Sequence, residues 1–345
     1  MAGVVRQPID EKAFEKFVSE NVPVIKTPIE LKQFGFEAPG KLLSKTAHQV
    51  EREYRVLHAL GPTDVAVPKT YCLCEDDSVI GTPFYIMEFL DGRIFEDFLM
   101  PGISPEERTA LWKEAVQTLA RFHAVDPHKV GLEKFGKAGG YFNRQIKTWG
   151  TIQAAQAKAV DIETKVPVGP LPHIEEILRF FGNEKQQPKD RVTLVHGDYK
   201  IDNLVFHKTE PRVIGILDWE MSTIGHPLSD VNNFLMQFAM CVQPDAGPTN
   251  TLAFQPGKTP GLPQVEQILE WYTEVSGYDP RPEMPWGSAF AIFRLAVVLQ
   301  GIAARYAARQ ASSANAKLYS QKRNSLGELA WVLAQEANQK TTPRL

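Results

Sequence analysis

Two stretches near the middle of the chain carry side chains that could do chemistry together. The first reads HGDYKIDN and places Asp198 and Asn203 in one short loop, and the second reads ILDWE and places Asp218 after an apolar run. A carboxylate can accept the proton of an attacking hydroxyl group, and carboxylate and amide oxygens are hard ligands of the kind that Mg²⁺ prefers. Phosphoryl transfer from ATP needs these groups, because the protein mainly positions the reactants and neutralises charge.

This chemistry assigns a role to each residue. Asp198 is the candidate catalytic base, and Asn203 and Asp218 are the candidate magnesium ligands. Lys200 offers a positive charge beside the transferred phosphate, whereas we interpret His196 as a brace of the loop rather than as the base. The alternative is that the two aspartates are solvated turn residues, but the apolar strands around both motifs make a chance match less frequent.

The hydrophobic pattern predicts the elements that position these residues. Strands are predicted at 192–196, 204–207 and 213–218, so that one strand-turn-strand returns Asp218 to the neighbourhood of Asp198. A long helix is expected to begin after Ser104, which is followed by proline and, three residues on, by glutamate. The other predicted helices cover residues 10–22, 47–60, 142–157, 174–181, 231–241, 265–276, 286–309 and 318–335, and the other predicted strands cover 29–36, 65–73 and 83–90.

The order of these elements indicates the fold class. A small mixed part is followed by a larger and mainly helical part with a few inserted strands. This is an α+β arrangement and lacks the regular strand-helix alternation of a doubly wound sheet.

Composition sets limits on the function. The chain has 345 residues, of which 43% are hydrophobic and 23% charged, as in an ordinary globular protein. With 38 Lys and Arg against 41 Asp and Glu, it lacks the strong positive charge expected of a dedicated nucleic-acid-binding protein. Three cysteines do not make a disulfide framework.

The same sequence bears on membranes and localisation. The apolar run at 286–308 contains Arg294, Gln300 and Arg305, so we expect a core helix rather than a membrane span. The first residues lack a secretory signal, and we expect a cytoplasmic protein, with the peroxisome as the alternative because the last residues are Pro343, Arg344 and Leu345. The oligomeric state is not indicated.

HGDxxxxN followed by ILDWE resembles the aminoglycoside phosphotransferase and choline kinase-like family. The chain is most similar to the kinase-like domains fused to some acyl-CoA dehydrogenases and to their stand-alone relatives. The resemblance implies a protein-kinase-like fold with an N-terminal lobe at 1–91 and a helical C-terminal lobe at 92–345. It also implies ATP and Mg²⁺ as cofactors and a small-molecule hydroxyl as acceptor, with a hydroxyacyl-CoA or hydroxy acid as the expected class. The stretches that carry it, besides the two motifs, are PGKLL, VEREYRVL, CEDDSVIGTPFYIMEFLDGR, GYFNRQIKTW and STIGHPLSDV, between residues 39 and 231.

The resemblance implies further site residues. The backbone of Glu88, Phe89 and Leu90 would form the hinge that faces adenine. Asp230 would support the catalytic loop. Glu53, or alternatively Glu51, would pair with a cation that contacts the phosphates.

The N-terminal lobe departs from the family pattern. A single predicted strand precedes PGKLL, and neither a Gly- and Ser-rich loop nor a cationic strand is visible there. Lys41 or Lys45 is the candidate to replace the cation of that strand. The lobe therefore lacks the pattern of part of its sheet, so that either the sequence is a truncated form or nucleotide binding is weakened or lost. The alternative function is accordingly a catalytically weak or inactive kinase-like module that binds a partner or metabolite.

Two other interpretations of the motifs have less support. Residues 35–41 nearly match a phosphate-binding P-loop, but Leu42 replaces the required hydroxyl residue and Pro39 lacks an N–H group. A metal-dependent phosphoesterase would need clustered ligands for a second metal ion, and the motifs do not supply them.

Overall fold

The structure of the chain is a computed structural model that describes residues 9–31, 50–241, 251–311 and 316–341. Lys41, Lys45, the P-loop-like segment and the last four residues of the chain lie outside these ranges. The predicted strand at 29–36 is described only over residues 29–31, which are irregular.

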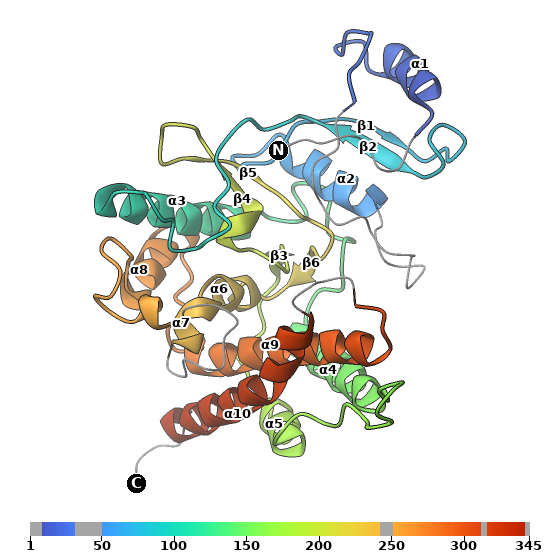
Figure 1. The fold of residues 1–345 in the computed structure, drawn as a ribbon. Helices are drawn as coiled ribbons and strands as arrows, with labels where there is room; N and C mark the ends of the chain where they lie inside the picture. Colours follow the sequence, from blue (N-terminus) through green and yellow to red (C-terminus); the bar gives the residue numbers. More distant parts are fainter. Residues whose placement is uncertain (1–8, 32–49, 242–250, 312–315, 342–345) are drawn as a thin grey trace.

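The first part of the chain gathers at one end of the molecule (Figure 1). It contains α1 (Glu11–Asn21), α2 (Val50–Leu60) and the antiparallel pair of β1 (Thr70–Cys74) with β2 (Phe84–Met87). Helix α1 begins after Asp10, whose side chain accepts a hydrogen bond from the Ala13 N–H at 3.0 Å. The predicted strand at 65–73 begins only at Thr70, and the carbonyl of Ala66 before it accepts a hydrogen bond from Ile216 N at 2.9 Å.

The rest of the chain is mainly helical. Helix α3 begins as the sequence predicts, with the Ser104 hydroxyl accepting a hydrogen bond from Glu107 N at 3.2 Å. The predicted helix at 231–241 is instead two short helices that meet at Leu235. The helices of this part are α3 (Pro105–His123), α4 (Tyr141–Ala157), α5 (Ile174–Phe181), α6 (Leu228–Phe234), α7 (Met236–Met240), α8 (Val265–Ser276), α9 (Met284–Ala307) and α10 (Ala316–Thr341), with short 3-10 turns at Ile201–Asn203 and Thr251–Phe254.

Helix α9 is the apolar segment in which the sequence predicts a core helix. Among the described residues it is the helix that is long and apolar enough to span a membrane by length and composition, with a mean hydropathy of 1.7. However, 67% of its most apolar window is buried inside the protein. It packs along α10 and against α4, as expected of a core helix.

Four short strands lie between the two ends (Figure 1). Strand β3 (Thr193–Val195) pairs with β6 (Thr223–Gly225), and β4 (Leu204–Phe206) pairs with β5 (Val213–Ile216), both antiparallel. The sequence predicts β3, β4 and β5 but not β6. These pairs place the loop after β3 beside the residues that follow β5.

The α+β architecture is confirmed. One buried apolar cluster extends from Val56, Leu57 and Leu60 of α2 to α3, the short strands and α8, and a second cluster lies around α9 and α10. The first cluster supports the loop that carries the HGDYKIDN motif.

Candidate active site

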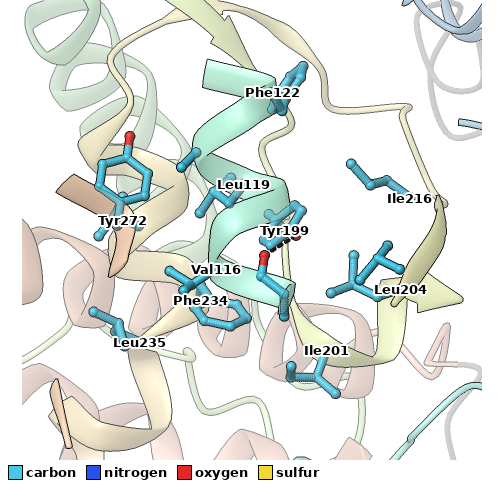
Figure 2. Close-up of a cluster of buried hydrophobic side chains, with 14 of the residues drawn as sticks. Val116, Leu119, Phe122, Tyr199, Ile201, Leu204, Ile216, Phe234, Leu235 and Tyr272 are labelled. Atoms are coloured by element: carbon cyan, nitrogen blue, oxygen red, sulfur yellow. Dashed lines mark hydrogen bonds between the residues drawn. The ribbon is translucent and has the colours of Figure 1, made fainter. Parts of the chain in front are cut away.

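Alternate residues of the loop after β3 are buried and anchor the loop to the core. Tyr199 and Ile201 are buried in the first cluster, and the Tyr199 hydroxyl donates a hydrogen bond to the Ala115 carbonyl of α3 at 2.6 Å (Figure 2). Asp198 and Lys200, which alternate with them, are only half-buried. The alternation of apolar and polar residues in the sequence thus anchors the loop and leaves its charged side chains accessible.

The Asp198 carboxylate receives three polar contacts. Asn203 Nδ2 lies 3.3 Å from Oδ2 and also donates to the Asp198 carbonyl at 2.9 Å. Lys200 Nζ lies 3.2 Å from the same Oδ2, and Asn233 Nδ2 lies 3.4 Å from Oδ1. These contacts fix the orientation of the carboxylate, which a base must have to meet a hydroxyl group.

Lys200 lies between two carboxylates. Its ammonium is 3.2 Å from Asp198 and 3.4 Å from Asp202. Partial burial disfavours the charged form, but the two carboxylates outweigh it and raise the pKa of Lys200. The side chain is therefore a permanent positive charge within reach of the candidate base.

His196 connects the backbone of the candidate base to Leu217, the residue before Asp218. Its Nδ1 accepts a hydrogen bond from Asp198 N at 3.2 Å, so its Nε2 carries the hydrogen that is donated to the Leu217 carbonyl at 2.9 Å. Burial lowers the pKa of His196, although the charges of Asp198 and Asp218 both act to raise it. The imidazole is therefore neutral and structural, which agrees with its interpretation as a brace.

The structure also brings Asn203 and the segment that carries Asp218 together beside the Asp198 loop. Leu217 N donates to the Asn203 carbonyl at 2.9 Å, so the residue before Asp218 is bonded directly to the candidate ligand. Asp218 itself adopts a left-handed backbone conformation with φ of 64°, which is uncommon for a residue with a side chain. Such strain is characteristic of functional positions.

The donor set at these residues fits Mg²⁺. The amide nitrogen of Asn203 is bonded to Asp198, so its oxygen points to the other side of the planar amide group. That oxygen and the Asp218 carboxylate are hard ligands, and Mg²⁺ is commonly held by one or two such groups together with substrate phosphates and water. The described part of the chain holds no cluster of three His, Cys, Asp or Glu residues for a metal.

Asp230 supports the loop by accepting hydrogen bonds from its backbone, as the resemblance implies. Its Oδ2 accepts hydrogen bonds from His196 N at 2.7 Å and His123 Nε2 at 3.1 Å, and its Oδ1 accepts one from Gly197 N at 2.9 Å. Burial acts to raise the pKa of Asp230, but the bond from His123 and the two neighbouring histidines lower it overall. The carboxylate therefore stays charged although it is completely buried.

Two residues of this network are not evident from the sequence. Asn233 of α6 donates to the Tyr199 carbonyl at 3.1 Å as well as to Asp198, and Arg294 of α9 donates to Asn233 Oδ1 at 3.0 Å. The same Arg294 nitrogen donates to the Gly197 carbonyl at 2.8 Å. The one signal in the sequence is that Arg294 is a charged residue within an apolar run.

The two glutamates that the resemblance offers as partners of a phosphate-contacting cation, Glu53 and Glu51, differ in their exposure. Glu53 is half-buried and accepts a hydrogen bond from the Tyr85 hydroxyl of β2 at 3.0 Å, whereas Glu51 is exposed. Burial and the charges of Glu53 and Asp218 raise the pKa of Tyr85. Glu53, Tyr85 and Asp218 are therefore electrostatic neighbours, although they come from three different elements.

The predicted hinge follows β2. The N–H of Glu88 donates to the Lys69 carbonyl at 2.7 Å, so this group is committed to the pairing of the two segments. Phe89 is 68% exposed. Leu90 packs over Gly215, where a Cβ atom would lie 2.0 Å from Leu90 Cδ1. Backbone recognition of adenine at Glu88, Phe89 and Leu90 stays a prediction.

Comparison with solved structures identifies the fold. A protein of Ralstonia eutropha classed with the aminoglycoside phosphotransferases is 34% identical, with a TM-score of 0.80 over 95% of this chain and 99% of that one. Macrolide 2'-phosphotransferase of Brachybacterium faecium, at 18% identity, covers 80% of each chain with a TM-score of 0.51. Ethanolamine kinase of Plasmodium vivax, at 13% identity, has a TM-score of 0.52 over 80% of this chain and 71% of that one. The protein-kinase-like fold is thereby confirmed.

Sequence relatives are longer than this chain. Mouse acyl-CoA dehydrogenase family member 10 is 36% identical over 297 residues, which are 86% of this chain and 26% of that protein. Rat acyl-CoA dehydrogenase family member 11 is 38% identical over 269 residues, which are 78% of this chain and 33% of that protein. This chain thus spans a quarter to a third of these relatives. The model of the phosphotransferase enzyme family matches residues 37–271, and the chain therefore belongs to that family.

Proposed function

We propose that the chain is an ATP- and Mg²⁺-dependent kinase that phosphorylates a hydroxyl group of a small molecule. Membership of the phosphotransferase enzyme family supports a kinase-type enzyme. The observation that carries the proposal is that one neutral imidazole bonds to Asp198 N and to the Leu217 carbonyl just before Asp218, while Asn203 bonds to both segments.

In the proposed reaction, the acceptor oxygen forms a bond to the γ-phosphorus while the bond from that phosphorus to the β–γ bridging oxygen breaks. Asp198 takes the proton of the hydroxyl group, and ADP leaves. Lys200 neutralises charge that develops near the transferred group. Asn203 and Asp218 would hold magnesium, which when bound neutralises the β- and γ-phosphates.

The proposed acceptor is a hydroxy acid or a hydroxyacyl-CoA. The support for this class is the similarity to proteins named as acyl-CoA dehydrogenase family members. The cytoplasm is the proposed compartment, with the peroxisome as the alternative.

The second candidate is a kinase-like module with little or no turnover. It is favoured by the sequence of the N-terminal lobe, in which neither a Gly- and Ser-rich loop nor a cationic strand is visible before PGKLL. The two candidates differ on turnover, and in the second one nucleotide binding is weakened or lost.

The test is an ADP-release assay with Mg·ATP and a panel of hydroxy acids and their CoA thioesters. Asp198→Asn is expected to lower kcat by about 100- to 10,000-fold, with the melting temperature unchanged. The matched control is Asp77→Asn, the same chemical change on an exposed turn between β1 and β2, which is expected to keep the wild-type rate. Binding of Mg·ATP without turnover on any acceptor would favour the second candidate, and an active Asp198→Asn variant would exclude Asp198 as the base.

A further inference from the structure

Arg52 of α2 reaches from the first part of the chain to two loops of the second. Its Nη2 donates hydrogen bonds to the Phe135 carbonyl at 3.1 Å and to the Ser222 carbonyl at 3.2 Å. Its guanidinium carbon also lies 4.4 Å from the centroid of the Phe135 ring, a distance at which a cation is attracted to the ring face. One side chain thus joins segments that are 83 and 170 residues away.

The two carbonyls belong to one packed unit. Phe135 is 2% exposed and Ser222 is 4% exposed. At the neighbouring Gly136, a Cβ atom would lie 2.6 Å from Ile224 N, so the two loops are in direct contact. Ser222 lies four residues after Asp218 and just before β6, which pairs with the strand leading to Asp198. Arg52 therefore binds the segment that carries a candidate metal ligand.

The next residue of α2 contacts β2. Glu53 accepts a hydrogen bond from Tyr85, and the charge of Asp218 acts on that same hydroxyl. Helix α2 thus bonds to Ser222 through Arg52, and the charges of Glu53 and Asp218 act on one hydroxyl group, that of Tyr85. The apolar residues of α2 turn one face of the helix to the core, and the hydrogen bonds of Arg52 add directional contacts to this packing.

We propose that Arg52 is a positioning residue that locks α2 onto the segment 218–222 and so fixes Glu53 relative to Asp218. A planar guanidinium with several donors suits this role better than a lysine, and each buried carbonyl requires a partner. The effect on turnover rests on the proposed function, whereas the contact itself does not.

Arg55 offers a matched control on the same helix. It is exposed, its Nη2 donates to the Gly131 carbonyl at 3.3 Å, and its guanidinium lies 6.0 Å from the Phe135 ring. Arg55→Met therefore removes a charge, a hydrogen bond and a ring contact from α2 without removing the bond to Ser222.

The first measurement is hydrogen–deuterium exchange of the full chain. Arg52→Met is expected to speed exchange at least fivefold in peptides covering 131–136 and 219–225, and Arg55→Met to leave 219–225 unchanged. Arg52→Lys keeps the charge but has a single ammonium group, so its exchange rate at 219–225 is expected to lie between those of the two methionine variants. It replaces Arg52→Met should that variant fail to fold. Wild-type exchange at 219–225 in the Arg52 variant would overturn the proposal.

The second measurement separates positioning from simple loss of stability. Because a misplacement of about 1 Å can cost about 100-fold in rate, Arg52→Met is expected to lower kcat by about 10- to 100-fold, with the KM for the acceptor within twofold of wild type. Equal kcat in the Arg52 and Arg55 variants would contradict the positioning role. Absence of turnover in the wild type would instead reject the proposed function, and the exchange data would still decide the role of Arg52.

Discussion

At the scale of single residues, the loop after β3 shows how a short sequence can be both anchored and reactive. Tyr199 and Ile201 are buried, while Asp198, Lys200 and Asp202 alternate with them and are partly accessible. A residue changed from apolar to polar in this alternation would release the anchor. The charged residues form ion pairs with one another, because Lys200 lies between the carboxylates of Asp198 and Asp202.

The orientation of Asn233 is set by its neighbours. Its amide oxygen accepts from Arg294, and this leaves the amide nitrogen for Asp198 and the Tyr199 carbonyl. If the amide were reversed, an oxygen would face the Asp198 carboxylate and repel it. Arg294 therefore determines which group of Asn233 the candidate base meets.

This contact leads to a prediction for Arg294→Met. Loss of the guanidinium leaves Asn233 Oδ1 and the Gly197 carbonyl without their donor, which typically costs about 1–3 kcal/mol. We expect kcat to fall by about 10- to 100-fold. Arg305→Met, on an exposed position of the same helix, is the control and should keep the wild-type rate. Steady-state kinetics of both variants decides, and equal rates would show that Arg294 does not orient Asn233.

At the scale of elements, local sequence signals predict much of the fold. The bounds of α5 and α8 agree with the predicted residues 174–181 and 265–276, and the Ser104 cap starts α3 as expected. These elements have their own hydrophobic period, cap or flanking breaks. The signals are local, so the sequence is sufficient to place them.

Other elements depend on tertiary contacts and were predicted wrongly or not at all. Strand β6 is only three residues long and exists because it pairs with β3, 30 residues earlier. The predicted helix at 231–241 in fact starts at Leu228 and breaks at Leu235. Neither event has a signal in neighbouring residues, since a strand this short and a mid-helix break are decided by the partners they pack against.

The connection between β2 and the helical part carries a prediction about stability. A Cβ atom at Gly92 would lie 2.3 Å from the Phe206 carbonyl and 2.6 Å from Val205 Cγ1. The backbone carbonyl cannot move aside, because Phe206 is paired with Arg93 by two hydrogen bonds. We expect Gly92→Ala to lower the free energy of unfolding by about 1–3 kcal/mol.

The control for this change is another glycine. At Gly150 in α4, a Cβ atom would meet only Leu178 methyl groups at 3.5 and 3.6 Å, an ordinary contact. Gly150→Ala is therefore expected to raise the free energy of unfolding by about 0.5–1 kcal/mol, because alanine loses less entropy in a helix. Urea denaturation, monitored by circular dichroism, measures the free energy of unfolding of both variants. The two changes relative to the wild type are expected to have opposite signs. A neutral Gly92→Ala would mean that the connection is not tightly packed.

At the scale of the whole molecule, one apolar core crosses the predicted boundary between residues 91 and 92. Residues of α2 share it with α3, the short strands and α8. The two parts are therefore not joined by the connection alone, and Arg52 adds directional bonds to this packing. The division into lobes at that boundary stays a prediction.

The site could be predicted only where its residues share a motif. Asp198, Asn203 and Asp218 lie within 20 positions of one another and are connected by short strands, so their spacing in the sequence indicates the chemistry. Asn233, Arg294 and Tyr85 enter the network through α6, α9 and β2. Their approach follows from the packing of whole elements, which no spacing in the sequence encodes.

The most direct test of the central claim is calorimetric titration of the full chain with ATP, with and without Mg²⁺. In the wild type, we expect Mg²⁺ to strengthen ATP binding at least tenfold, and chelation of the metal to abolish the gain. In Asp218→Asn, which removes a charged ligand, we expect the gain to be lost while the melting temperature stays near that of the wild type. Equal dependence on Mg²⁺ in both proteins, or no binding of ATP at millimolar concentration, would contradict a magnesium and nucleotide site at Asp198, Asn203 and Asp218.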